Sequence, residues 1–400
     1  MIRLLAQPAA TDQLNRQLAA GRLPHALVFA GPAGVGKHTA ALWLAQRLLC
    51  LDPVTTLTGE IEPCDACESC RLLLKLANDA PSDGDDDTDD PIPGVAHPDL
   101  HLIHKQLAAT SSVATLRTRK QTNIPVDLLR EHVVGGATSD GNAHDAPAFK
   151  SPVLSRHKVF VIDEAELLDG YAQNVLLKTL EEPPPNTTLI LVTAREDRLL
   201  PTIRSRCQRV PFSPLPDDVV TQWLTDHLQA ASERSEAADH DIPWLTQFAA
   251  GSLGRAKIAI DQGLAAWGAA LEPQLDALAQ GKPAPTLGGD LYERVQAFAE
   301  AAVKKHKNAS KEAANRVAAS LAWSIVARHA HRRLTAEADA ATPRDLPAAA
   351  RLERWAAVLD AVHEAEGLLA SNVNLSLLCD DLAARCATLL NPLPKLTPAA

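Results

Sequence analysis

The sequence predicts an α/β P-loop domain with a parallel sheet and an inserted four-cysteine module, followed by two all-helical domains. An apolar run at 27–31 ends in a glycine-rich loop, and helical spacing follows it over 38–49. Further apolar runs that predict strands lie at 99–105, 157–166, 186–194 and 206–212. Aliphatic runs that alternate with helices are typical of a parallel sheet covered on both faces. After residue 213 these runs stop, and the chain becomes rich in Ala and Leu with helical spacing.

Size and composition indicate a globular protein of two or three domains. The chain has 400 residues, of which 46% are hydrophobic and 22% are charged. Its net charge is −10, and six aspartates within 83–90 supply most of that acidity, which argues against an overall basic footprint for DNA. No apolar run reaches the roughly 18 residues of a membrane span, and the first residues turn polar too early for a secretion signal. We therefore expect a cytoplasmic protein.

We place the domain boundaries where the pattern changes. The P-loop domain takes residues 1–213, and two inserts interrupt it. The insert at 79–96 is acidic and is expected to be disordered, and the insert at 135–152 is expected to be a long mobile loop. A small helical lid domain is expected over 214–272 and a larger helical domain over 273–400, with the Pro-rich stretch 271–290 as a linker.

The segment GPAGVGKHTA at 31–40 has the spacing of a phosphate-binding loop. Backbone N–H groups around Gly31, Gly34 and Gly36 would surround a phosphate, and Lys37 would reach its oxygens. The next position normally carries the hydroxyl that binds Mg²⁺, but here it is His38, and Thr39 comes one residue late. An imidazole is a poor ligand for so hard an ion, so hydrolysis should suffer more than nucleotide binding. The alternative is a glycine-rich turn that binds nothing.

Two carboxylates follow the strand predicted at 157–166. Asp163 would be the second anchor for Mg²⁺, and Glu164 could polarise an attacking water. A solvated strand end is the alternative for such a pair. Its position within the same α/β domain as the glycine-rich loop favours the functional interpretation.

Four cysteines cluster in one short segment, and their spacing predicts a structural zinc site. Cys50, Cys64, Cys67 and Cys70 can converge tetrahedrally on one ion, and the absence of histidine from the set favours a closed site. The alternative is a set of free surface thiols. Three other cysteines, Cys207, Cys379 and Cys386, are expected to be ordinary buried residues.

Arg206 lies in the triplet Ser-Arg-Cys, just before the last predicted strand. An arginine at a subunit surface can act as an arginine finger on the γ-phosphate of a neighbour. From these three letters alone, a structural surface arginine is the simpler interpretation.

Taken in order, these segments resemble the AAA+ clamp-loader ATPases of bacterial replication. The resemblance is carried by GPAGVGKHTA, the four cysteines, HPDL (97–100), VFVIDEAELL, NVLLKTLEEPPPNTTLILVT and LLPTIRSRCQ. It covers about 1–260 well, and the C-terminal block more weakly through SNVNLSLLCDDL (371–382). The segment NVLLKTLEEPP is the most specific of them.

The resemblance implies a subunit of a hetero-pentameric ring that opens a sliding clamp and closes it around primed DNA, using ATP. It implies that the four cysteines hold zinc and that Arg206 is the finger that reaches the adjacent subunit's ATP site. It also implies that Thr193 is a polar sensor, that Arg255 is a second sensor and that the last helical domain is the collar of the ring.

Within this family we expect a stator-like subunit with little ATP hydrolysis of its own, because His38 replaces the Mg²⁺-binding hydroxyl. A motor subunit that hydrolyses ATP and a structural scaffold that binds no nucleotide are the alternatives. The chain would belong to a DNA-directed DNA polymerase holoenzyme without carrying polymerase activity itself.

Overall fold

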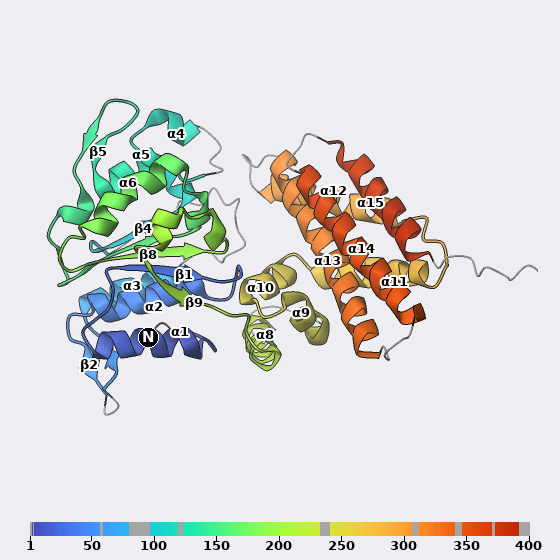
Figure 1. Ribbon diagram of the computed structural model, residues 1–400, viewed down its shortest axis with the longest axis horizontal. Helices are drawn as coiled ribbons and strands as arrows, with labels where there is room; N and C mark the ends of the chain where they lie inside the picture. Colours follow the sequence, from blue (N-terminus) through green and yellow to red (C-terminus); the bar gives the residue numbers. More distant parts are fainter. Residues whose placement is uncertain are drawn as a thin grey trace, which may run out of the picture. The chain divides into compact units, whose positions relative to one another are not determined.

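The computed structural model describes residue 2 and residues 4–56, 59–79, 97–118, 123–232, 241–305, 311–340, 346–369 and 373–391. The chain divides into two compact units (Figure 1). The first contains the α/β part and the segment 249–257, and the second contains the segments 239–248 and 258–400.

The first unit is built on a sheet of five parallel strands in the order β4-β7-β8-β1-β9. All five strands coincide with apolar runs that the sequence predicts to be strands. Their bounds are β1 Ala26–Ala30, β4 Leu100–Ile103, β7 Lys158–Ile162, β8 Thr187–Thr193 and β9 Gln208–Pro211. Because consecutive parallel strands need crossover connections, helices lie on both faces of the sheet.

Side chains of the central strands alternate between two hydrophobic cores. In β1, Leu27 and Phe29 belong to one core, whereas Val28 and the flanking alanines belong to the other. The first core is closed by α1, α2 and α3, and the second by α5 and α6, as the two layers around the sheet show in Figure 1. The predicted α/β fold with a parallel sheet covered on both faces is therefore confirmed.

The helices of the first unit are mostly short. They are α1 Pro8–Ala19, α2 Lys37–Leu49, α3 Glu68–Asp79, α4 Ala114–Thr118, α5 Val126–Leu129, α6 Gly170–Glu181, α7 Pro201–Arg204 and α8 Asp217–Ser232. Four 3₁₀ turns are η1 Lys105–Thr110, η3 Pro147–Phe149, η4 Ala165–Leu167 and η5 Glu196–Arg198, and η2 Arg130–Val134 is a π-helical turn. Between α2 and α3, the hairpin of β2 Val54–Thr55 and β3 Ile61–Glu62 forms part of the inserted cysteine module.

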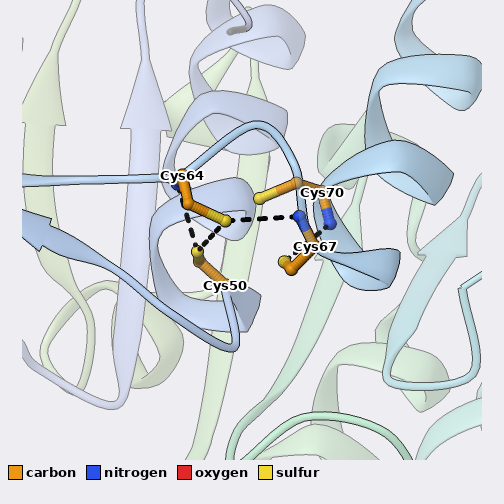
Figure 2. A group of neighbouring side chains, drawn as sticks. All are labelled: Cys50, Cys64, Cys67 and Cys70. Carbon is orange, nitrogen blue, oxygen red and sulfur yellow. Dashed lines mark hydrogen bonds between the residues drawn. The ribbon is translucent and has the colours of Figure 1, made fainter.

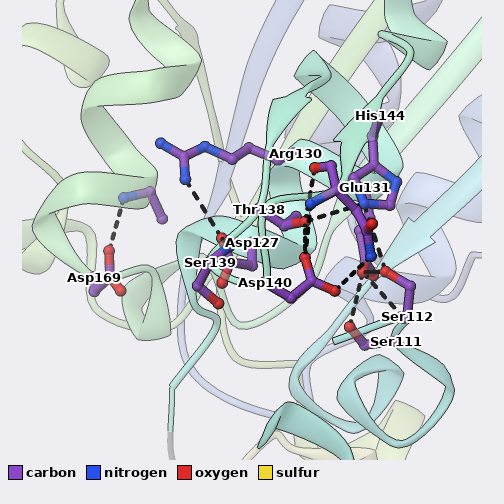
Figure 3. A network of polar contacts seen from close by, with 12 residues as sticks. Ser111, Ser112, Asp127, Arg130, Glu131, Thr138, Ser139, Asp140, His144 and Asp169 are labelled. Carbon is purple, nitrogen blue, oxygen red and sulfur yellow. Dashed lines mark hydrogen bonds and ion pairs between the residues drawn. The ribbon is translucent and has the colours of Figure 1, made fainter. Parts of the chain in front are cut away.

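The insert at 135–152 has more regular structure than the long loop that the sequence predicts. It contains the hairpin of β5 Gly136–Ala137 and β6 Ala143–His144, followed by the turn η3. Figure 3 shows the polar contacts that hold this hairpin. The Thr138 hydroxyl donates to Asp140 Oδ1 (2.6 Å), and the backbone N–H of Ser139 donates to Asp127 Oδ1 (3.2 Å). Polar side chains replace the apolar alternation that would have indicated strands, so the sequence analysis does not predict this hairpin. The mobility expected of the insert stays a prediction.

The second unit is helical. Its helices are α9 Ile242–Ala249, α11 Leu264–Ala279, α12 Leu287–Lys305, α13 Lys311–Ala340, α14 Leu346–Leu369 and α15 Leu375–Leu390, and α10 Leu253–Asp261 leads into it from the first unit. Trp323 is completely buried, and many other buried residues of these helices are alanines, whose small side chains let helices approach closely. The predicted run of helices after the sheet is confirmed.

The linker predicted over 271–290 is wrong, because α11 continues through Pro273 to residue 279. Leu271, Leu275 and Leu278 are buried on one face of this helix, and their burial outweighs the hydrogen bond that proline cannot make. The boundary expected at 272/273 falls inside α11, and the division into three domains stays a prediction.

The insert expected at 79–96 lies almost entirely outside the described residues. Among the helices that are described, none combines the length and the apolar character that a bilayer crossing requires.

Candidate functional site

The glycine-rich loop lies at the carboxyl edge of the sheet. It leaves β1 at Ala30, which pairs with Thr193 at the end of β8, and the backbone N–H of Gly31 donates to the Thr193 carbonyl (3.4 Å). Helix α2 starts at Lys37, directly after the loop. Ligands of open α/β sheets bind at this edge, where the helix directs its first N–H groups toward the loop. The structure therefore places the loop in the strand–loop–helix context that the sequence predicts.

Two glycines of the loop are required by close packing. A Cβ on Gly31 would collide with the carbonyl oxygen of Phe212. Gly34 has a φ of +71°, and a Cβ there would collide with the Ser252 hydroxyl. The Ser252 hydroxyl donates to the Ala33 carbonyl (3.0 Å), and the backbone N–H of Gly254 donates to the Gly34 carbonyl (3.1 Å). The segment 252–254 thus packs directly on the phosphate loop.

The Lys37 ammonium points back into the loop. It donates to the carbonyl oxygens of Gly31 (2.8 Å) and Pro32, and the residue is only 6% exposed. A phosphate in the loop would offer this ammonium a charged partner in place of two carbonyls. His38 and Thr39 follow on the first turn of α2 and are half-buried.

The carboxylates of the DEAE segment lie at the same edge. Asp163 directly follows β7, and its backbone N–H donates to the Ile103 carbonyl (2.9 Å). Glu164 adopts a left-handed conformation with a φ of +48°, and it pairs with Lys105 across 3.4 Å. Backbone conformations of this kind cost energy in a non-glycine residue and concentrate at functional sites. Thr193 is buried at the end of β8, where its hydroxyl accepts a hydrogen bond from the N–H of Arg195 (3.0 Å).

Arg255 lies beside the loop, whereas Arg206 lies elsewhere. Arg255 is exposed in the first turn of α10, and its backbone N–H donates to the same Ser252 hydroxyl (3.2 Å) that bonds the loop. Arg206 follows α7, and its guanidinium donates to the Thr202 carbonyl (3.0 Å) and pairs with Glu181 at the end of α6. The structure thus groups every predicted nucleotide-site residue except Arg206 around one edge of the sheet.

The sequence analysis does not identify three residues that lie near this edge. His104 follows β4, and burial lowers its pKa although the nearby Asp163 charge opposes that shift. Lys105 pairs with Glu164, and Ser252 bonds the loop. Their positions depend on strand order and on a contact across more than 200 residues, which no local pattern reveals. His104 and Lys105 are the last two residues of the run 99–105 that the sequence predicts to be a strand, and this is the one signal that could have found them.

The four cysteines form one cluster (Figure 2). Their Sγ atoms all lie within 4.8 Å of one another, and Cys50 Sγ is 3.6 Å from Cys64 Sγ. A tetrahedral zinc with bonds of about 2.3 Å needs sulfurs roughly 3.8 Å apart, so this arrangement fits such an ion. Cys50 directly follows α2, Cys64 and Cys67 lie in the loop that follows β3, and Cys70 lies in α3. The module could therefore hold a metal ion.

Backbone groups around the cluster are arranged to stabilise thiolates. The N–H of Cys64 donates to Cys50 Sγ (3.3 Å), that of Cys67 to Cys64 Sγ (3.3 Å), and that of Cys70 to Cys67 Sγ (3.4 Å). Backbone N–H groups of Ala66 and Cys67 lower the pKa of Cys64 to about 7, whereas burial raises the pKa of Cys50 and of Cys70. Metal binding would supply the charge that keeps the thiols of Cys50 and Cys70 deprotonated.

The remaining cysteines behave as ordinary side chains. Cys379 and Cys386 are buried in α15, as the sequence predicts, and Cys207 is half-buried. Burial raises the pKa of each of these three thiols to about 12. A protonated thiol of this kind is neither a nucleophile nor a metal ligand.

Comparisons with known proteins agree with this geometry. A family model described as "DNA polymerase III, delta subunit" matches residues 6–81 and 142–216. The DNA polymerase III subunit gamma/tau of Mycobacterium tuberculosis is 33% identical over 213 residues, which are 53% of this chain and 28% of that protein. The DNA polymerase III subunit delta' of Bacillus subtilis is 30% identical over 227 residues, 56% of this chain and 54% of that protein. The delta' subunit of Pseudomonas aeruginosa is 30% identical over 201 residues, 50% of this chain and 46% of that protein.

A glycine-rich loop at the carboxyl edge of a parallel sheet, followed directly by a helix, is the arrangement of P-loop proteins. With the matches above, the α/β part of the chain is similar to the delta' and gamma/tau subunits of DNA polymerase III. The aligned segments span between about a quarter and a half of the length of these relatives, 28% to 54%. A solved gamma subunit-related protein of Thermotoga maritima aligns over 96% of this chain and 99% of its own, with 16% identity and a TM-score of 0.39.

Proposed function

We propose that this chain is a delta'-type, stator-like subunit of the clamp loader, which helps to load the sliding clamp onto primed DNA. The observation that carries the proposal is His38, because it occupies the position that gives Mg²⁺ a hydroxyl in a complete phosphate loop. Without that hydroxyl the metal loses one ligand next to the β- and γ-phosphates. Nucleotide could still bind through the loop and Lys37, but hydrolysis would be slow.

In this role the partners are the gamma/tau and delta subunits of a hetero-pentameric ring, and the clamp and DNA are reached through the complex. Arg206 would serve as a finger in the ATP site of a neighbour, and its exposed position after α7 supports this. Residues 273–400 would form the collar of the ring, with 214–272 as a lid. A replication subunit works where the chromosome lies, so we place the protein in the cytoplasm.

We also propose that zinc is the ion of the four-cysteine site. Zinc accepts four thiolates in a tetrahedron without strain, and an all-cysteine set leaves no coordination position for substrate. Cys50, Cys64, Cys67 and Cys70 would hold it. The ion would then join the end of α2 to the start of α3 and would take no part in catalysis.

The second candidate is a gamma/tau-type motor subunit that hydrolyses ATP. Lys37, Asp163, Glu164 and Thr193 all lie at one edge of the sheet, which is what a working ATP site needs. The match to a gamma/tau subunit at 33% identity also favours it. In this case Thr39 or a water molecule would have to replace the missing hydroxyl.

Calorimetry of ATP binding to the purified chain, with and without Mg²⁺, separates these candidates. We expect negligible steady-state hydrolysis by the unmodified chain and little effect of Mg²⁺ on affinity. His38→Thr should tighten Mg²⁺-dependent binding about tenfold, because it restores an oxygen ligand. Thr39→Val is the matched control, and it should change neither quantity.

Two results would decide against the stator role. Turnover by the unmodified chain that Lys37→Ala abolishes would establish the motor subunit. Loss of that turnover in Thr39→Val would further identify the displaced hydroxyl as the metal ligand. If no variant binds ATP, His38→Thr included, the chain is a scaffold that does not use nucleotide.

A further inference from the structure

A buried chain of hydrogen bonds connects the four-cysteine module to the sheet. It starts at the carbonyl of Leu49, the last residue of α2 and the neighbour of Cys50. Carbonyls in the last turn of a helix have no partner within the helix. This one accepts two hydroxyl groups, from Ser69 (2.7 Å) and from Ser155 (2.9 Å). Ser69 directly precedes Cys70, so the bond ties together the two segments that carry Cys50 and Cys70.

His97 continues this chain beyond Ser69. Its Nε2 lies 2.8 Å from the Ser69 hydroxyl, and its Nδ1 accepts the backbone N–H of Asp99 (3.1 Å). The Ser69 proton is already used on Leu49, so His97 must donate from Nε2, which is consistent with Nδ1 acting as the acceptor. His97 is 2% exposed, and burial lowers its pKa, which favours this neutral form. Both ring nitrogens and the hydroxyl are thus satisfied in one arrangement only.

Asp99 anchors the far end of the chain. Its buried carboxylate accepts the backbone N–H groups of Val153 (2.6 Å), Leu154 (2.8 Å) and Ser155 (2.6 Å). The backbone of Asp99 also accepts the N–H of Val159 in β7 (2.9 Å). Asp99 is therefore fixed at the edge of the sheet, and it limits the movement of His97, which lies two residues earlier in the chain.

We propose that His97 is the positioning residue of the four-cysteine site: acting through Ser69, it holds the Leu49–Cys50 and Ser69–Cys70 segments at the separation that one metal ion requires. The inference rests on the proposed zinc. The two segments come from different helices, and a metal site binds more tightly when neighbouring groups hold its ligands in place. Hydrogen bonds that orient metal ligands are typically worth about 10–100-fold in metal affinity.

Two substitutions at His97 distinguish its hydrogen bond to Ser69 from its hydrogen bond to the backbone N–H of Asp99, which forms a local turn. The amide nitrogen of Gln can reach the place of Nε2, so His97→Gln keeps a donor toward Ser69. Asn carries its oxygen at the place of Nδ1, so His97→Asn keeps the turn with Asp99 and breaks the link. Ser69→Ala breaks the link from the other side. His157→Asn is the matched control, because His157 is half-buried and, like His97, bonds a hydroxyl through Nε2, that of Thr188 (2.9 Å).

The experiment measures zinc content, the rate of zinc release to a chromogenic chelator, and the absorption spectrum of the cobalt-substituted protein. The unmodified chain should contain about one zinc per chain. His97→Asn and Ser69→Ala should each release zinc about tenfold faster, with altered cobalt bands, and the double variant should be no faster than either single one. His97→Gln and His157→Asn should stay close to the unmodified protein. Equal release rates in His97→Asn and the unmodified chain would overturn the proposal, as would additive effects in the double variant.

A second readout keeps the positioning role testable without zinc. In metal-free protein, labelling of Cys50 and Cys70 by a thiol reagent is followed by peptide mass spectrometry. Loosening by His97→Asn should accelerate labelling of these two thiols several-fold and leave Cys386 unchanged. If the unmodified chain contains no zinc but this acceleration is seen, only the choice of zinc fails. If zinc is present and neither release nor labelling responds to His97→Asn, the positioning role fails.

Discussion

Asp99 illustrates how a single residue can fix the backbone that carries a site. A carboxylate is a pure acceptor, and here it faces three successive N–H groups of a loop that has no ladder partners of its own. Bonds to a charged acceptor are stronger than bonds between neutral groups. The sequence shows an aspartate in HPDL but not its partners, because these lie more than 50 residues later in the chain.

We expect Asp99→Asn to destabilise the first unit by about 3 kcal/mol. The variant keeps one acceptor oxygen and turns an amide group toward N–H donors, so at least one buried donor loses its partner. Urea unfolding followed by circular dichroism measures the change. Asp145→Asn is the control, because Asp145 is exposed and pairs only with Lys150 (2.8 Å), so its loss should cost less than about 1 kcal/mol. Similar costs for the two variants would show that Asp99 does not hold the loop.

At the scale of elements, apolar periodicity predicts the sheet because its strands are buried on both sides. β1 and β7 are buried along their whole length, so each appears as an unbroken aliphatic run. The same reasoning fails for the hairpin β5–β6, whose strands are two residues long and held by polar side chains. It also fails at Pro273, where the leucines of α11 outweigh a residue that usually ends helices.

In the candidate site, too, some residues could be predicted from the sequence and others could not. The cysteine cluster could be predicted because its four ligands lie within 21 residues, and short spacing limits where they can be. The residues around the phosphate loop come from strands β4, β7 and β8, and no local sequence pattern predicts the order of these strands in the sheet. His97 lies in the segment HPDL, but no residue near it in the sequence indicates that its partner is Ser69.

Buried histidines should make the first unit sensitive to acid. Burial lowers the pKa of five of them: His97, His101, His104, His132 and His157. The pKa of His101 falls to about 4, where its ring stacks on Phe160 at 4.4 Å. On acidification the unfolded chain binds protons near pH 6.5, before the folded chain does. The free energy of unfolding should therefore be fully present above about pH 6.5 and should fall as the pH is lowered from there toward 4.

Urea unfolding between pH 8 and pH 5 measures this slope. His101→Phe provides the control, since Phe can keep the stack on Phe160 and cannot be protonated. The variant should lose a smaller part of its stability on acidification than the unmodified chain. Because both proteins carry the same cysteines, any loss of stability from metal release at low pH affects both pH profiles and cancels when they are compared. Parallel pH profiles for the two proteins would show that His101 contributes nothing to the acid sensitivity.

At the scale of the whole molecule, the function proposed for the chain requires an assembly. Arg206 is half-exposed in the isolated chain, and its partner Glu181 is more exposed still. Ion pairs of this kind are worth about 0–1 kcal/mol, so little energy holds the guanidinium on its own surface. A neighbour's γ-phosphate would be a stronger partner, because guanidinium and phosphate form paired, charge-assisted hydrogen bonds.

Arg206→Ala in the reconstituted loader tests this role. The variant should fold and assemble normally, because it removes only two contacts of a half-exposed side chain, the pair with Glu181 and the bond to the Thr202 carbonyl. DNA-stimulated ATP hydrolysis and clamp loading by the whole complex should fall. A finger is worth roughly 10³–10⁵ in rate in GTPases, and one site among several would show a smaller share, so we expect a loss of about tenfold. Arg206→Lys should restore little, because an ammonium cannot reproduce the planar guanidinium. Arg209→Ala is the matched control, since it removes a nearby exposed pair with Glu196 (2.7 Å) and should leave both rates unchanged. A ring that carries Arg206→Ala and loads clamps at the unmodified rate would rule out the finger and leave the chain a scaffold.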